Sequence, residues 1–254
     1  MATLSPYDTL LLTADKGVTK AQASLRTLAT LGFLGGAFIS VGYLAYLRIV
    51  GAMPPELVGL GKFIGAAVFP VGLVCILIGG GELITGNMMV LPVAWLRKRI
   101  SLAALARNWW IVTLFNVLGA FFVAWFFGHV VGLTEGHYLH VTESVAKAKV
   151  DESFWQAVVS GVGCNWLVCM GVWLCYAADS MSGKVLGAWF PVMTFVAIGF
   201  QHVVANMFVI PAAIWGGGAI GWGQFAENMI AVYLGNVLGG ALMVGALYAL
   251  AYRE

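Results

Sequence analysis

Charged residues are scarce in this chain. They make up 9% of the 254 residues, whereas an ordinary soluble domain has about 25%. Hydrophobic residues make up 61%, and the mean hydropathy is +0.92. A water-soluble fold of this composition would leave too much apolar surface exposed to water. The sequence therefore predicts a polytopic integral membrane protein whose main solvent is the lipid bilayer.

Basic residues are also few and scattered. The 13 lysines and arginines leave a net charge of +2, which argues against nucleic acid as a partner. Residues 1–26 lack the long apolar core of a cleavable signal, and we expect them to form an amphipathic segment on the cytoplasmic face. The cysteines lie in apolar runs without a CxxC pair, so we expect buried thiols and neither a metal site nor a cofactor. They are Cys75, Cys164, Cys169 and Cys175.

Six apolar windows are long enough to cross a membrane, because a bilayer core about 30 Å thick requires about 20 helical residues. The second and fifth windows are too long for one straight helix, and a polar stretch interrupts each near its middle. We predict an all-α domain over residues 27–254 with six membrane-spanning helices, of which the second and fifth are broken. The windows are 27–50, 62–95, 108–132, 155–178, 185–215 and 226–252.

The distribution of basic residues predicts the orientation. Nine of them fall on the side of the two termini and four on the other side. The excess of positive charge marks the cytoplasmic face, so we expect both termini in the cytoplasm, an inner (cytoplasmic) membrane location, and the long loop at 133–153 outside. The nine are Lys16, Lys20, Arg26, Arg97, Lys98, Arg99, Arg107, Lys184 and Arg253, and the four are Arg48, Lys62, Lys147 and Lys149.

The two halves of the chain resemble each other. The interruption of the second window reads ELITGNMM from Glu82, and that of the fifth reads QHVVANMF from Gln201. Phe-Pro-Val occurs before each interruption and Asn-Val-Leu-Gly after it. The offsets between the two halves are 121 residues for Phe-Pro-Val, 119 for the interruptions and 120 for Asn-Val-Leu-Gly. Since each half has three spans, the second half must enter the membrane from the opposite face. We therefore predict an inverted repeat over about 27–132 and 155–252, whose breaks mark a substrate pathway.

The breaks favour anion chemistry. Backbone that leaves the helix at membrane depth must line a cavity or be buried in protein. Each break also creates a half-helix whose N-terminal amides carry partial positive charge. Two such helix ends directed at a common centre favour a small anion over a cation.

Several polar side chains at the breaks are candidates for contact with this anion. His202 can donate to an anion in either protonation state and is the strongest candidate. Thr85 offers either a donating hydroxyl or a bond back to its own helix. We expect Asn87, Asn206, Glu82 and Gln201 to fix the loops, with Glu82 capping amides. For Lys149 the residues alone favour a solvated loop charge over an anion attractor.

The motifs GELITGNM at 81–88, GCNWLVC at 163–169 and QHVVANMF at 201–208 resemble the formate/nitrite transporters over nearly the whole chain. That resemblance implies an aquaporin-like homopentamer that moves small monovalent anions, as a channel or with protons. It also makes His202 the central histidine and Thr85 the threonine of the first break. Asn206 becomes the asparagine of the second break, and Lys149 with Asn165 the pair that attracts the anion. Two apolar constrictions are implied at Phe69, Leu73, Leu83, Val168 and Phe195, with Ile84 where an aromatic is common.

Formate is the predicted substrate, because the stretches GGAFIS, FPVG, GELITGNM and GLTEG are most similar to the formate branch of that family. Nitrite and hydrosulfide are the alternatives. A pore for neutral solutes, like that of the aquaporins, is the alternative from another functional class, although the breaks lack the Asn-Pro-Ala pattern of aquaporins. An intramembrane enzyme is disfavoured, since the chain has no HExxH, GxSG or paired intramembrane aspartates.

Overall fold

The computed structural model describes residues 3–252. Residues 1–2 of the predicted N-terminal segment, and Arg253 of the orientation count, lie outside the described residues. Within them the chain is helical, apart from one isolated β-bridge between Thr3 and Ala178. The first helix, α1 (Pro6–Gln22), begins where its sequence favours a start, because Ser5 caps it and Pro6 occupies its first turn.

Within the described residues, six helical stretches are long and apolar enough to cross a membrane, which confirms the predicted six-span architecture. The second span begins at Pro55, earlier than predicted. The spans are α2 (Leu25–Gly51), η1–α3–α4–η2 (Pro55–Gly80), α6–η3 (Leu102–Val130), α8 (Phe154–Ala177), α9 (Met181–Ile198) and α11–η5–α12 (Trp222–Ala251).

The second and fifth spans are interrupted where the sequence predicts. After η2 (Cys75–Gly80) the backbone is extended through residues 81–83, and the shorter helix α5 (Ile84–Leu96) follows. After α9 the chain turns at Gly199, whose φ of 90° lies in the left-handed region that favours glycine. The shorter helix α10 (Val203–Trp215) then begins after His202.

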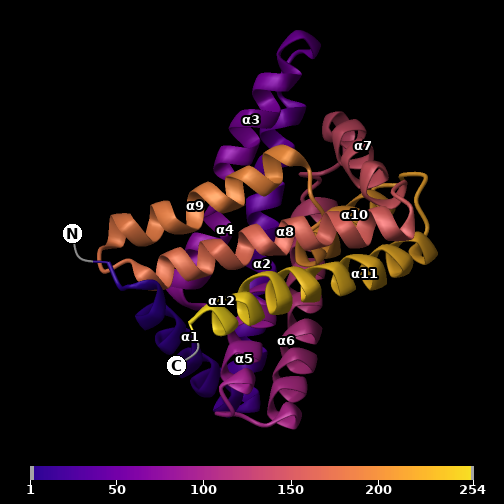
Figure 1. Ribbon diagram of the computed structural model, residues 1–254. Helices are drawn as coiled ribbons and strands as arrows, with labels where there is room; N and C mark the ends of the chain where they lie inside the picture. Colours follow the sequence, from indigo (N-terminus) through magenta and orange to yellow (C-terminus); the bar gives the residue numbers. More distant parts are fainter. Residues whose placement is uncertain (1–2, 253–254) are drawn as a thin grey trace.

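The two repeats pack in the same way. Helix α2 packs on α6 and α8 on α11, while α8 also lies beside α9 (Figure 1). A Cβ atom at Gly36 would overlap the carbonyl of Asn116, and one at Gly235 would overlap the carbonyl of Val158. Gly36 of α2 and Gly235 of α11 therefore allow close helix contacts within one protomer.

The segment at 133–153, predicted as a loop, contains the helix α7 (Leu139–Val150). Its 12 residues include charged side chains and are too short to form a membrane-length apolar window. Helix α7 packs on α10, as α1 (Pro6–Gln22) packs on α5, and Figure 1 shows α1 and α7 at opposite ends of the molecule. Each broken span is thus braced by a short helix from its own half.

Candidate substrate pathway

Two buried asparagines cap the half-helices that start at the breaks. The side-chain oxygen of Asn116 accepts from the Ile84 amide at 2.9 Å, and that of Asn236 accepts from the Val203 amide at 2.9 Å. Their amide groups donate to the carbonyls of the preceding breaks, at Glu82 and Gln201 among others. Backbone groups that lipid could not satisfy are thereby hydrogen-bonded. The sequence comparison marked both asparagines by their repeat offset but did not identify this capping role.

Replacing Asn236 by leucine is expected to lower the melting temperature of the purified protein. Leucine has a similar volume, but it would leave the Val203 amide and the carbonyl of Gln201 without a partner, at about 1–3 kcal/mol for each group. Thermal unfolding in detergent measures the effect, with the exposed Ser182→Ala as control. Equal melting temperatures for Asn236→Leu and the wild type would contradict this role.

At the first break, the carboxylate of Glu82 joins the two helices α1 and α5. It accepts from the Lys20 ammonium of the N-terminal helix at 2.7 Å and from the Asn87 amide at 2.7 Å. Asn87 also donates to Asn108, which in turn donates to the Lys20 carbonyl at 3.0 Å. Glu82 and Asn87 hold the loop in place, whereas the amide-capping role expected for Glu82 belongs to Asn116.

The second break repeats this network with one change. Asn206 donates to Gln201 at 2.6 Å and to Asn228 at 2.8 Å, as Asn87 does to its two partners. Asn228 donates to the carbonyl of Lys149, so Lys149 occupies the place that Lys20 has in the first half. Because the side chain of Gln201 ends in an amide, its nitrogen donates to that same carbonyl at 3.0 Å and no ion pair replaces the Lys20–Glu82 pair.

The ammonium of Lys149 is hydrogen-bonded to backbone carbonyls. It donates to Gly199 at 2.8 Å and to Phe200 at 3.4 Å, in the stretch that interrupts the fifth span. Burial lowers the pKa of Lys149, and the negative charge of Glu152 opposes that shift. A half-buried cation with no carboxylate bound to it is well suited to attract an anion.

His202 and Thr85 connect the two breaks. The Nε2 atom of His202 lies 3.0 Å from the hydroxyl oxygen of Thr85, and its Nδ1 accepts from the Ala205 amide at 3.1 Å. Since Nδ1 is an acceptor, the ring as it is placed carries its proton on Nε2 and donates to Thr85. The Thr85 hydroxyl is then free to donate its own hydrogen to a passing molecule.

A cavity of about 1090 Å³, called the vestibule below, reaches His202 from the side of the molecule where α7 lies. Its wall includes the charged side chains of Lys149 and Glu152 and the phenyl rings of Phe69 and Phe195. The two phenyl rings pack edge to face at 5.8 Å, and the Phe195 ring stacks on the imidazole of His202 at 5.7 Å. Lys149 and His202 therefore line one cavity, whose wall beside His202 is apolar.

Several of the other residues predicted for the pathway do not line the vestibule. Asn165 does not line this cavity; its amide donates to the Thr85 carbonyl at 3.1 Å and the Asn236 carbonyl at 2.6 Å, so it connects the breaks. The structure thus does not place Asn165 beside the ammonium of Lys149. Four of the predicted constriction residues are buried in the same apolar core as Phe69 and Phe195 but do not line the cavity. They are Leu73, Leu83, Ile84 and Val168.

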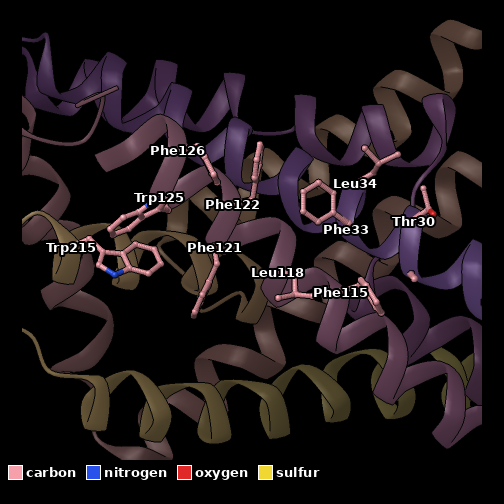
Figure 2. Close-up of a pocket in the computed structure, with 11 residues that line it drawn as sticks. Thr30, Phe33, Leu34, Phe115, Leu118, Phe121, Phe122, Trp125, Phe126 and Trp215 are labelled. Carbon is pink, nitrogen blue, oxygen red and sulfur yellow. The ribbon is translucent and has the colours of Figure 1, made fainter. Parts of the chain in front are cut away.

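A second cavity, of about 750 Å³, has a different character (Figure 2). It lies between α2 and α6, and aromatic and aliphatic side chains such as Phe33, Phe121 and Trp125 line it. Its polar groups are the hydroxyl of Thr30 and the indole N–H groups of Trp125 and Trp215. The residues that line it include no charged side chain, so it offers no charge that would attract a small anion.

The comparisons with known proteins agree with this geometry. A family model described as "Formate/nitrite transporter" matches residues 7–250. The chain is 53% identical to an uncharacterized transporter, YrhG, of Bacillus subtilis, with 100% of this chain and 96% of the relative covered. It is 47% identical to the formate channel BtFdhC of Bacillus thuringiensis, with coverages of 100% and 98%.

Two solved structures have the same fold. One, described as an FNT family ion channel, has a TM-score of 0.90 and 26% identity, with 97% of this chain and 99% of that chain covered. The other, a pentameric formate channel with formate bound, has a TM-score of 0.79 and 28% identity, with 91% and 98% covered.

Proposed function

The chain belongs to the formate/nitrite transporter family, and from that premise we propose that it carries formate across the membrane as the neutral acid. The family consists of transporters and channels rather than enzymes. The observation that supports the proposal most strongly is the vestibule, which Lys149 and His202 both line together with Phe69 and Phe195. In this proposal the paired rings of Phe69 and Phe195 form an apolar constriction between Lys149 and His202.

The vestibule and the constriction favour different forms of the substrate. Lys149 attracts the formate anion from water, because a cation and an anion attract strongly where little water separates them. A bare anion would lose most of its hydration between Phe69 and Phe195, which is strongly unfavourable. Protonated formate has no charge and loses much less. Protonation between Lys149 and the constriction therefore allows formate to pass.

At the centre, the two breaks present hydrogen-bond donors to the passing acid. The Thr85 hydroxyl accepts from His202 and keeps its own hydrogen available. The helices α5 and α10 both begin here, so their N-terminal ends favour electron-rich oxygen atoms. These groups can replace part of the water that the substrate leaves in the vestibule.

The assembly and orientation follow from the relatives and from the charge distribution. A pentameric formate channel shares the fold, which supports a homopentamer with one pathway in each protomer. The excess of basic residues on the side of the termini supports a cytoplasmic membrane location with both termini inside. The vestibule at Lys149 then faces outward.

Purified protein in liposomes is expected to take up radiolabelled formate faster than empty liposomes do, and the rate should rise as the external pH falls from 7.5 to 5.5. More of the substrate is protonated at low pH, and only that form crosses the constriction easily. Nitrite and hydrosulfide measured in parallel establish the preference within the family. Glycerol uptake equal to formate uptake at every pH would contradict anion transport and favour a neutral-solute pore.

A further inference from the structure

The two ends of the pathway differ in charge. At the first break Glu82 forms an ion pair with Lys20, so that cation is neutralised within the protein. At the second break the corresponding side chain is the neutral Gln201. Among the described residues, the ammonium of Lys149 consequently has only backbone carbonyls as hydrogen-bond acceptors. The outer end of the pathway thus holds a cation whose counter-charge must come from elsewhere.

The carboxylate of Glu152, which has no counterpart in the first half, lies near Lys149. Lys20 and Lys149 are related by an offset of 129 residues, and the same offset relates Glu152 to Ala23. Glu152 lines the same cavity as Lys149, and its Oε2 atom is buried without a hydrogen-bond partner among the described residues. Among these residues no ion-pair contact within 4.0 Å joins Glu152 to Lys149. The two groups therefore face one cavity without being paired.

The other titratable groups of the cavity do not replace Glu152. Lys62 of α3, His137, His140 of α7 and His202 bear nitrogen bases, and α2 contributes the phenols of Tyr43 and Tyr46. His137 lies 3.1 Å from the carbonyl of Gly51, and Lys62 is exposed. Among the described residues that line the cavity, Glu152 is the only carboxylate. It alone can compete with a substrate anion for Lys149.

We propose that Glu152 couples anion capture to proton uptake, an inference that rests on the proposed function. Lys149 requires one negative charge, which either the Glu152 carboxylate or the formate anion can supply. Formate therefore binds best when Glu152 is protonated. The Glu152 carboxylic acid then transfers its proton to a formate oxygen, so that formate becomes formic acid and Glu152 becomes a carboxylate that neutralises Lys149.

The transfer balances in charge and protons. The O–H bond of Glu152 breaks as an O–H bond to a formate oxygen forms, and the pair carries one negative charge before and after the transfer. Formic acid, no longer held by Lys149, moves towards Phe195 and His202. Glu152 regains a proton from external water, which prepares Lys149 for the next anion. One proton therefore accompanies each formate.

The Glu152→Gln variant distinguishes the binding of formate at Lys149 from proton transfer to formate. Glutamine keeps the shape of the glutamate side chain but has neither its negative charge nor its acidic proton. In liposomes the wild-type KM for formate is expected to rise between pH 5.5 and 7.5 as the carboxylate competes. In Glu152→Gln the KM should stay constant and lie about tenfold below the wild-type value at pH 7.5, the equivalent of one pKa unit. The maximal rate should fall, since water must supply the proton directly. Glu152→Asp should restore the rise in KM.

The neighbouring Asp151→Asn is the matched control. Asp151 is exposed and forms an ion pair with Lys147, and neither residue lines the cavity. The dependence of KM on pH in the Asp151→Asn variant should therefore match that of the wild type. A Glu152→Gln variant that folds normally and keeps the wild-type rise of KM with pH would overturn the inference while leaving formate transport intact. Wild-type liposomes with no formate uptake above empty liposomes would refute the proposed function, and the inference with it.

Discussion

Replacing Lys149 by alanine is expected to lower formate uptake at low formate concentration by about 10- to 100-fold. Hydrogen bonds to charged groups contribute about 1.5–3 kcal/mol, and each 1.4 kcal/mol is a factor of about ten. The fold should persist, because the bonds from Gln201 and Asn228 end on the backbone carbonyl, which alanine retains. Uptake of radiolabelled formate into liposomes at fixed external pH measures the loss.

Lys147→Ala is the control for removal of a positive charge. Lys147 lies on the same helix α7, but its side chain is 62% exposed and paired with Asp151. Its loss should change uptake less than twofold, because exposed ion pairs contribute little and salt screens them. Similar losses for the two variants would show that general surface charge, and not the ammonium in the vestibule, attracts formate.

Replacing Phe195 by alanine is expected to raise lactate uptake by about tenfold or more relative to formate uptake. The Phe195 ring lines the vestibule and packs against both Phe69 and the imidazole of His202. Its removal both widens the constriction and admits water, so larger monocarboxylates and charged forms face a smaller barrier. The ratio of lactate to formate uptake in the same liposomes measures this selectivity.

The stability of the variant must be compared as well, because truncating a buried phenylalanine typically destabilises a protein by about 3–5 kcal/mol. Phe190→Ala removes the same ring from the same helix at a side chain that is 62% exposed. It should leave the selectivity ratio unchanged. If Phe195→Ala folds and keeps the wild-type ratio of lactate to formate uptake, Phe195 is not part of the constriction.

The architecture was predictable because hydropathy and repetition are local signals. Apolar windows gave the six spans, and the matching motifs at Glu82 and Gln201 located both interruptions. Helix α7 was not predicted, because its amphipathic sequence is shorter than a membrane span and its packing on α10 is a long-range contact. Composition alone does not reveal such contacts.

The site was predictable only in part. His202 and Thr85 were expected at the breaks, but their contact depends on how two helices 117 residues apart meet. Asn108 and Asn228 were overlooked although an offset of 120 residues relates them, because no motif surrounds them. Glu152 was also overlooked, since its repeat counterpart is Ala23 and a loop carboxylate has no signature in one sequence.

The number of protons that enter with each formate, measured at a controlled membrane potential, tests most directly whether formate crosses as the neutral acid. We expect one proton to enter with each formate. A membrane potential of either sign, set with potassium and valinomycin, should leave formate accumulation unchanged within about twofold. A bare anion gains or loses about 2.3 kcal/mol per 100 mV, which would shift accumulation by about 50-fold. Uptake that follows the potential, without proton entry, would contradict passage as the neutral acid.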